Sequence, residues 1–199
     1  MKKTRLKTID RILEIVGKSH TIAVCSHMRP AGDCIGSTLG LALALLDQGK
    51  EVTCWNQDLV PSKLRFLDPD QLIQPPRPIK RPFDCVISVD AASIERLGAA
   101  QEHIANRGTL INIDHHTSNT RFGDVNWIAS KAPPSGALVS PLTTAPGWKI
   151  TPRLADRPFT AISTDPGSSP SPRTLPQTSH TASDHVTKGP APPPDAANL

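Results

Sequence analysis

The sequence predicts an α/β protein: a parallel β-sheet flanked by helices, followed by a poorly specified C-terminal tail. Short apolar runs rich in β-branched residues alternate with helical patterns over the first 130 residues, which is typical of βαβ units. Such units have right-handed crossovers and place helices on both faces of the sheet. After residue 132 the composition changes, because most of the 21 prolines lie there and apolar periodicity fades.

The first half of the core begins with an amphipathic helix, in which residues 6, 9, 13 and 16 are apolar at helical spacing. Residues 21–25 form a short β-branched and apolar run and predict a buried strand. Residues 30–33 contain proline and glycine and predict a turn. Residues 36–48 are rich in leucine and alanine, so they predict a helix that ends at Gly49.

The second half continues the alternation of strands and helices. A strand is expected over residues 51–56, followed by a proline-rich surface loop over residues 68–82. The apolar run over residues 84–90 predicts the next strand. Ser93 is a suitable N-cap for a helix running to about residue 106, and residues 109–113 predict a further strand.

Charge and composition restrict the partners. The net charge of +4 is matched by the excess of Lys and Arg over Asp and Glu in residues 1–19, so the rest of the chain is neutral overall. With no tyrosine and few other aromatic residues, the chain lacks material for stacking long single strands, so a short nucleotide substrate is expected instead. No apolar run reaches transmembrane length, and neither a signal peptide nor a membrane partner is predicted.

The four cysteines are Cys25, Cys34, Cys54 and Cys85. They show neither paired metal-ligand spacing nor the density of a disulfide scaffold. We therefore expect reduced, structural thiols and a cytoplasmic location.

Metal-type side chains follow three of the predicted strands: His27 with the nearby Asp33, then Asp90, then Asp114-His115-His116. In open parallel sheets, ligands bind beyond the carboxyl ends of the strands. A single aspartate after a strand is usually a turn former, but three such groups on one edge favour a metal site. Carboxylates and imidazoles suit Mn²⁺ or a similar ion better than a thiolate-bound zinc.

Three segments around these residues resemble, in order, the first three motifs of the DHH phosphoesterases. They are SHMRPAGDCIGS over 26–37, VISVDAASIERLG over 86–98 and NIDHHTSNTRFGDVNWI over 112–128, and TAISTDPGS over 160–168 resembles a fourth. Within that family the chain is most similar to the RecJ-like branch. The nearest group is that of the bacterial bifunctional oligoribonucleases and 3′-phosphoadenosine 5′-phosphate phosphatases, the nano-RNases. The resemblance implies the N-terminal domain fold of that family.

The resemblance also implies roles for individual residues. Two Mn²⁺ ions would be held by His27, Asp33, Asp90, His115 and Asp165, with Asp90 bridging the ions. His116 would contact the scissile phosphate, and Asp114 would orient the histidines. Arg96 and Asn119 match the second and third motifs of the family and are candidates for contact with phosphate, although an arginine on a helix and an asparagine in a turn are as often structural.

The chain departs from the family pattern in two places. Ala31 stands where the family has a metal-binding aspartate, so the first metal site is expected to be weakened. Beyond residue 130, Pro141, Pro146 and Pro158 interrupt the helical stretches, and Pro166 follows Asp165 directly. We therefore expect a DHH core over 1–130, a divergent remainder with the fourth motif over 131–170, a disordered tail over 171–199, and no C-terminal substrate-binding domain.

Three functions remain open on the sequence. The first is an Mn-dependent phosphoesterase, impaired by Ala31, that hydrolyses short oligoribonucleotides, 3′-phosphoadenosine 5′-phosphate or both. The second is a catalytically inactive module that binds metal and nucleotide. The third is a phosphoesterase or pyrophosphatase acting on another small phosphorylated substrate. The oligomeric state is open as well, a homodimer included.

Overall fold

The computed structural model describes residues 2–129, together with residues 139, 141–143, 145 and 148. Within this part of the chain, no helix is both long enough and apolar enough to cross a bilayer. The expected divergent remainder over 131–170 and the expected tail over 171–199 fall outside the described residues, apart from those few positions. Asp165 and the fourth motif also lie outside them.

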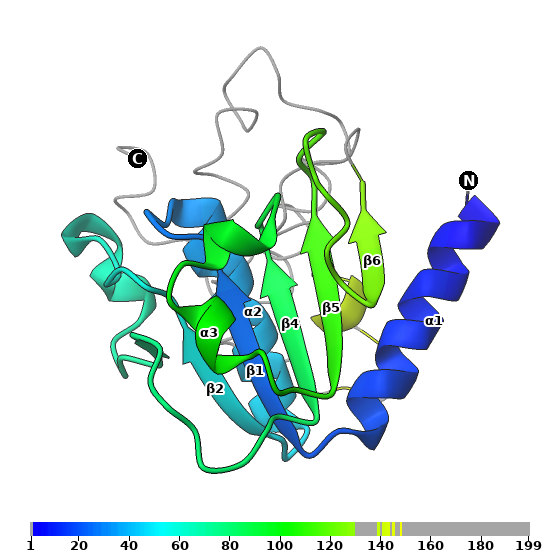
Figure 1. Ribbon diagram of the computed structural model, residues 1–199, viewed down its shortest axis with the longest axis horizontal. Helices are drawn as coiled ribbons and strands as arrows, with labels where there is room; N and C mark the ends of the chain where they lie inside the picture. The colour runs from blue at the N-terminus through cyan, green and yellow to red at the C-terminus, as the bar shows by residue number, and fades with distance from the viewer. Residues whose placement is uncertain (1, 130–138, 140, 144, 146–147, 149–199) are drawn as a thin grey trace.

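A six-stranded, fully parallel sheet forms the centre of the protein, with the strand order β3-β2-β1-β4-β5-β6 (Figure 1). The strands are β1 (Thr21–Ser26), β2 (Glu51–Trp55), β3 (Ile73–Gln74), β4 (Cys85–Val89), β5 (Thr109–Asp114) and β6 (Val125–Ile128). The chain leaves β1 toward β2 on one side and returns to β4 on the other. The order therefore reverses between β1 and β4, the point where open α/β sheets bind ligands.

Helices cover both faces of the sheet, as predicted. The helices α1 (Lys2–Lys18) and α2 (Gly32–Asp47) pack on one face, where Ile12 and Leu39 meet alternate residues of the strands such as Ile87. The short helices η2 (Ile94–Leu97) and α3 (Ala100–His103) cover part of the other face, where Leu97 joins the buried cluster. This alternation follows from the period of two along each strand, which sends successive side chains to opposite faces.

The parallel α/β architecture is confirmed, and the strands over 21–25, 51–56, 84–90 and 109–113 form as expected, within one residue at either end. Three elements were not predicted: β3, β6 and the 3₁₀ helix η1 (Ser62–Leu67). The proline-rich loop over 68–82 contains the two-residue strand β3, which pairs with the edge of β2. The four cysteines are buried and free, in agreement with the expectation of reduced thiols.

Two helix boundaries differ from the prediction. Helix α2 begins at Gly32, four residues before the expected start at Gly36, because Gly32 and Asp33 form its first turn instead of belonging to a preceding turn. The single helix expected over residues 93–106 is wrong. Gly98, with φ 56°, separates η2 from α3, and Ser93 makes no side-chain capping bond. A left-handed residue ends a helix, and glycine adopts that conformation without a Cβ penalty.

Candidate metal centre

The topology brings those predicted ligands that lie within the described residues to one edge of the sheet. His27 directly follows β1 and Asp90 directly follows β4, so both stand at the point where the strand order reverses. Asp114 is the last residue of β5, the next strand along, and His115 and His116 continue from it. Asp33 reaches the same edge from the first turn of α2.

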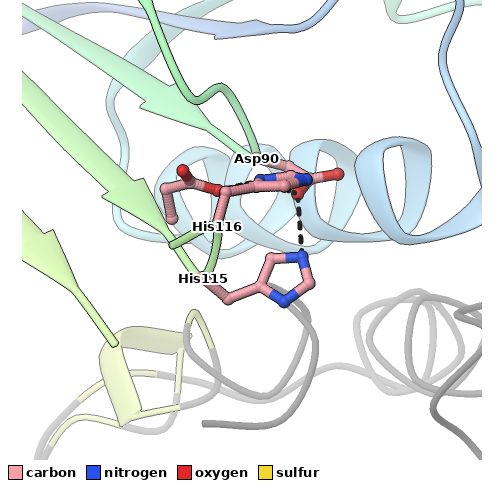
Figure 2. A group of neighbouring side chains, drawn as sticks. Asp90, His115 and His116 are labelled. Carbon is pink, nitrogen blue, oxygen red and sulfur yellow. Dashed lines mark hydrogen bonds and ion pairs between the residues drawn. The ribbon is translucent and has the colours of Figure 1, made fainter. Parts of the chain in front are cut away.

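Asp90 lies at the centre of the group. Its Oδ2 is 3.3 Å from Nε2 of His27, and its Oδ1 is 3.3 Å from Nε2 of His115. Figure 2 shows the imidazole of His115 directed at this carboxylate, with the ring of His116 alongside. The two oxygens of one buried side chain are therefore each faced by a different imidazole.

The backbone of Asp90 supports this position at an energetic cost. Its φ of 58° is left-handed, a conformation uncommon for any residue with a side chain but better tolerated by aspartate than by most. The Asp90 N–H donates to the carbonyl of Ile113 at 3.0 Å, which ties the end of β4 to β5. Strained residues of this kind persist where the surrounding structure fixes them, and they concentrate at functional sites.

Asp33 approaches the same nitrogen of His115 as Asp90 does. Its Oδ2 lies 3.6 Å from Nε2 of His115, and its Oδ1 accepts a hydrogen bond from Ser37 Oγ at 3.2 Å. The side chain is almost fully buried at the positive end of α2, which favours the ionised carboxylate. His115 thus stands between two carboxylates from different elements.

A second layer of contacts holds His116. Its Nδ1 lies 2.7 Å from Oδ1 of the fully buried Asp114, and its side chain is 45% exposed. The other Asp114 oxygen accepts a hydrogen bond from Asn119 Nδ2 at 2.6 Å. With Nδ1 donating to a fixed carboxylate, the ring has one tautomer, and Nε2 remains for a group outside the protein.

The two candidate substrate contacts differ in their surroundings. Arg96 is exposed on η2, with Nη2 3.3 Å from Nδ1 of His27, so its guanidinium stands at the rim of the group. Asn119, in contrast, uses both ends of its amide within the protein. Its Oδ1 accepts from the N–H of Arg121 at 2.7 Å and from Asn112 Nδ2 at 3.2 Å. This arrangement favours a positioning role for Asn119 over direct contact with a phosphate.

The hydrogen bonds and ion pairs around Asp90 shift the pKa values of the side chains of the site. Burial disfavours ionisation of Asp90, but hydrogen bonds from His115 and His27 outweigh burial and hold its pKa well below the ordinary value. Burial likewise disfavours charge on His27, yet hydrogen bonds to Asp90 and Cys34 raise its pKa to about 11. The hydrogen bond to Asp114 raises the pKa of His116. The raised pKa values of His27 and His116 favour protonated rings beside the Asp90 carboxylate, and a divalent cation can replace such protons.

Two overlapping sets of donors have the chemistry and spacing for cations. Asp90, Asp114, His115 and His116, here termed the histidine cluster, have ligand atoms within 4.8 Å of one another. His27, Cys34 and Asp90, here termed the thiol cluster, meet the same distance. Both sets contain Asp90, and the nitrogen and carboxylate donors of the histidine cluster fit Mn²⁺.

Some residues of the site were not singled out by the sequence. Cys34 was assigned a structural role, but its Sγ joins the thiol cluster. Asn56 donates from Nδ2 to Ser26 Oγ and to the carbonyl of His27, both at 2.9 Å, and so fixes the loop that carries His27. Asn56 directly follows β2, so the rule about carboxyl ends of strands could have identified it.

Ala31 lies beside the site without contributing to it. It is the N-cap residue of α2, it is exposed, and it makes no side-chain capping bond. An aspartate at this position could cap the helix and present a carboxylate to the same edge. The methyl group of Ala31 can do neither.

Comparison with known proteins identifies the family. The DHH family, N-terminal domain, matches residues 21–162. The bifunctional oligoribonuclease and PAP phosphatase NrnA of Thermus thermophilus is 32% identical over 164 residues, which are 82% of this chain and 48% of that protein. The chain thus spans about half the length of this curated relative.

Solved structures agree on the fold. An exopolyphosphatase-related protein from Bacteroides fragilis superposes with a TM-score of 0.82 and 23% identity, over 92% of this chain and 57% of that one. The exonuclease RecJ bound to manganese superposes with a TM-score of 0.50 and 14% identity, over 91% of this chain and 46% of that one. The family match, the parallel sheet and the DHH triplet at its carboxyl edge lead to one conclusion: the chain belongs to the DHH family and carries its N-terminal domain.

Proposed function

We propose that this chain is the catalytic part of an Mn-dependent phosphoesterase that hydrolyses short oligoribonucleotides and 3′-phosphoadenosine 5′-phosphate. The observation that carries the proposal is the Asp90 carboxylate, whose two oxygens each lie 3.3 Å from a different imidazole at the carboxyl edge of the sheet. The substrate class comes from the similarity to NrnA, whose name gives both activities.

His27, Asp33, Asp90 and His115 would hold two divalent cations, and Asp165 would complete the set. Asp90 is suited to be the shared ligand because each oxygen faces its own histidine. When bound, such a pair of cations supplies a nucleophilic hydroxide at neutral pH and stabilises the charge that develops on the phosphoryl group.

The remaining side chains would position the substrate. His116 is partly exposed and held in one orientation by Asp114, which also raises its pKa, so the protonated ring can donate its Nε2–H to a phosphate oxygen. Asn119 keeps Asp114 in place from the other side. The Arg96 guanidinium at the rim adds a positive charge beside the phosphate position.

A second function is favoured by one observation, the exposed methyl side chain of Ala31 at the N-cap of α2. With one carboxylate fewer, the chain could hold a single ion with Asp33, Asp90 and His115 and bind nucleotide without hydrolysing it. The loss of a carboxylate ligand is expected to weaken the His27 side of the site by at least about 10-fold in affinity.

The decisive experiment compares the wild-type chain with Ala31→Asp and Asp90→Asn. A dinucleotide, 3′-phosphoadenosine 5′-phosphate and pyrophosphate are offered in turn with Mn²⁺, and Mn²⁺ stoichiometry is measured by calorimetry. We expect turnover of the first two substrates, an increase of at least about 10-fold in Ala31→Asp, and none in Asp90→Asn.

Asp84→Asn is the matched control, because Asp84 is an aspartate at the start of β4, at the opposite end of the strand from Asp90. It should retain wild-type turnover. If neither substrate is hydrolysed even by Ala31→Asp, the phosphoesterase proposal is wrong. A single Mn²⁺ equivalent with nucleotide affinity and no product would establish the binding module instead.

A further inference from the structure

Cys34 occupies a position that its neighbours make chemically significant. It lies in the first turn of α2, three residues after Ala31, and is fully buried. Its sulfur, an imidazole nitrogen of His27 and a carboxylate oxygen of Asp90 all lie within 4.8 Å of one another. Among the cysteines of the described residues, Cys34 is the one that belongs to such a group.

The orientation of His27 directs the correct nitrogen toward this group. Nδ1 lies 2.8 Å from the carbonyl of Met28, so the ring donates its Nδ1–H to the backbone. Nε2 is then the nitrogen that faces Asp90, 3.3 Å from its Oδ2, and it gives up its proton when a cation binds. A backbone carbonyl that fixes the tautomer is the usual support of a metal-bound histidine.

The surroundings of the sulfur hold it at the site. It lies 3.8 Å from the carbonyl of His27 and 3.9 Å from Asn56 Nδ2, and it hydrogen-bonds with the side chains of His27 and Ser26. Asn56 also holds the carbonyl of His27, so one amide supports both the sulfur and the histidine loop. The fold therefore places the sulfur beside the imidazole with which it would share a bound cation.

We propose that His27, Cys34 and Asp90 form a thiolate-containing metal site that prefers Zn²⁺ to Mn²⁺, with Cys34 supplying the ligand that Ala31 cannot. The inference rests on the proposed two-metal function and changes the nature of its first site. Three protein ligands with nitrogen, sulfur and oxygen donors match the sets that hold Zn²⁺ with one open position. A thiolate selects softer ions, whereas Mn²⁺ prefers oxygen donors.

Binding is balanced by the release of two protons. The Cys34 thiol and Nε2 of His27 each lose a proton to solvent as the cation binds, and the sulfur then carries the negative charge that the missing carboxylate would have carried. The other side of Asp90, with Asp33 and His115, keeps oxygen and nitrogen donors only. We therefore expect a mixed centre, with the softer ion beside Cys34 and Mn²⁺ beside His115.

The test uses Co²⁺, which substitutes for Zn²⁺ and reports thiolate ligation through a near-ultraviolet charge-transfer band. Metal-free protein is titrated with Co²⁺ in the wild type, in Cys34→Ala and in the control Cys25→Ala. Cys25 is also buried, but it belongs to the cluster on the opposite face of the sheet. We expect the band in the wild type and in Cys25→Ala, its loss in Cys34→Ala, and at least about 10-fold weaker Zn²⁺ binding in that variant.

Two further measurements keep the outcome decisive. Circular dichroism checks that Cys34→Ala is folded, and Cys34→Ser, of nearly the same size, repeats the comparison if it is not. Bound Co²⁺ without the band in the wild type would overturn the inference, as would a band that persists in folded Cys34→Ala. The Co²⁺ band does not depend on turnover. A protein that shows the band but hydrolyses no substrate would therefore refute the phosphoesterase proposal and still support the thiolate-containing metal site.

Discussion

Asp114 illustrates how a buried carboxylate can hold neighbouring side chains in place. It is fully buried at the end of β5, and its two oxygens are used by His116 and Asn119. Burial opposes ionisation of Asp114, but the hydrogen bonds from His116 and Asn119, together with the charge on His116, outweigh it and keep the pKa of Asp114 below its ordinary value. The bond between Asp114 and His116 also raises the pKa of His116. Asp114 is thus a buried anion that orients His116.

Replacing Asp114 by asparagine tests this role at the scale of one residue. The substitution keeps the shape but removes the negative charge, so the pKa of His116 is expected to fall toward the value of an isolated imidazole. NMR titration of the His116 ring in metal-free protein measures the change directly. If the protein is active, the rate of phosphoester hydrolysis should also fall, by about 10–100-fold.

The control for this prediction is again Asp84→Asn. Asp84 accepts hydrogen bonds from the backbone N–H groups of His20 and Thr21. It lies at the other end of the strands from His116. It should leave the His116 titration unchanged. An unaltered His116 pKa in Asp114→Asn would show that the carboxylate does not act on the ring.

At the scale of elements, the interruption between η2 and α3 shapes the loop that carries His27. Gly98 has φ 56° and ψ −135°, and an added Cβ would lie 2.2 Å from Gln57 Oε1. That oxygen accepts the N–H of Ala99 at 2.9 Å. On the other side of the break, the carbonyl of Arg96 accepts the N–H of Met28 at 2.8 Å. The broken helix therefore holds the residue next to His27.

Gly98→Ala should destabilise the protein by about 1–3 kcal/mol, because alanine cannot adopt this conformation without strain and would displace the Gln57 side chain. Urea unfolding followed by circular dichroism measures the loss. Gly17→Ala is the matched control: Gly17 lies within α1 and nothing approaches its Cβ position within 4 Å. There the same change should stabilise the helix by about 0.5–1 kcal/mol. Equal effects at the two positions would contradict the explanation.

At the scale of the whole molecule, the buried thiols make the stability of the protein depend on pH. Burial raises the pKa of Cys25 and of Cys85 to about 12, whereas an exposed thiol titrates near 8.5. The unfolded chain therefore loses these protons first as the pH rises. The stability contributed by the neutral thiols is complete below about pH 8.5 and is lost progressively as the pH climbs toward 12.

Urea midpoints at pH 8 and pH 10 should accordingly differ, with a loss on the order of 1–2 kcal/mol for each such thiol. Cys25→Ala and Cys85→Ala should each show a smaller decline between the two pH values than the wild type. Ser88→Ala, a buried change on the same strand as Cys85, removes no titrating group and should decline as the wild type does. A decline of equal size in all four proteins would place the alkaline sensitivity elsewhere.

The sequence by itself determined the fold class, the main strands and the edge of the sheet where the candidate site lies. Period and composition specify a strand locally, and the carboxyl ends of parallel strands must meet, so His27, Asp90 and the Asp114-His115-His116 triplet could be placed together without coordinates. The break at Gly98 could not be seen in this way, because it depends on a contact with Gln57 from a distant loop. Strand β6 was missed because its role as a strand comes from pairing with β5.

Only the tertiary structure decided how the side chains of the site divide their contacts. The sequence could not show that Asp90 turns one oxygen to His27 and the other to His115, nor that both ends of the Asn119 amide are used within the protein. The sequence also predicted a structural role for Cys34, as it did for the other three cysteines. Such distinctions depend on distances of a few ångströms between residues far apart in the chain. Those distances are set by how the helices pack on the sheet, and the pattern of residue types does not contain them.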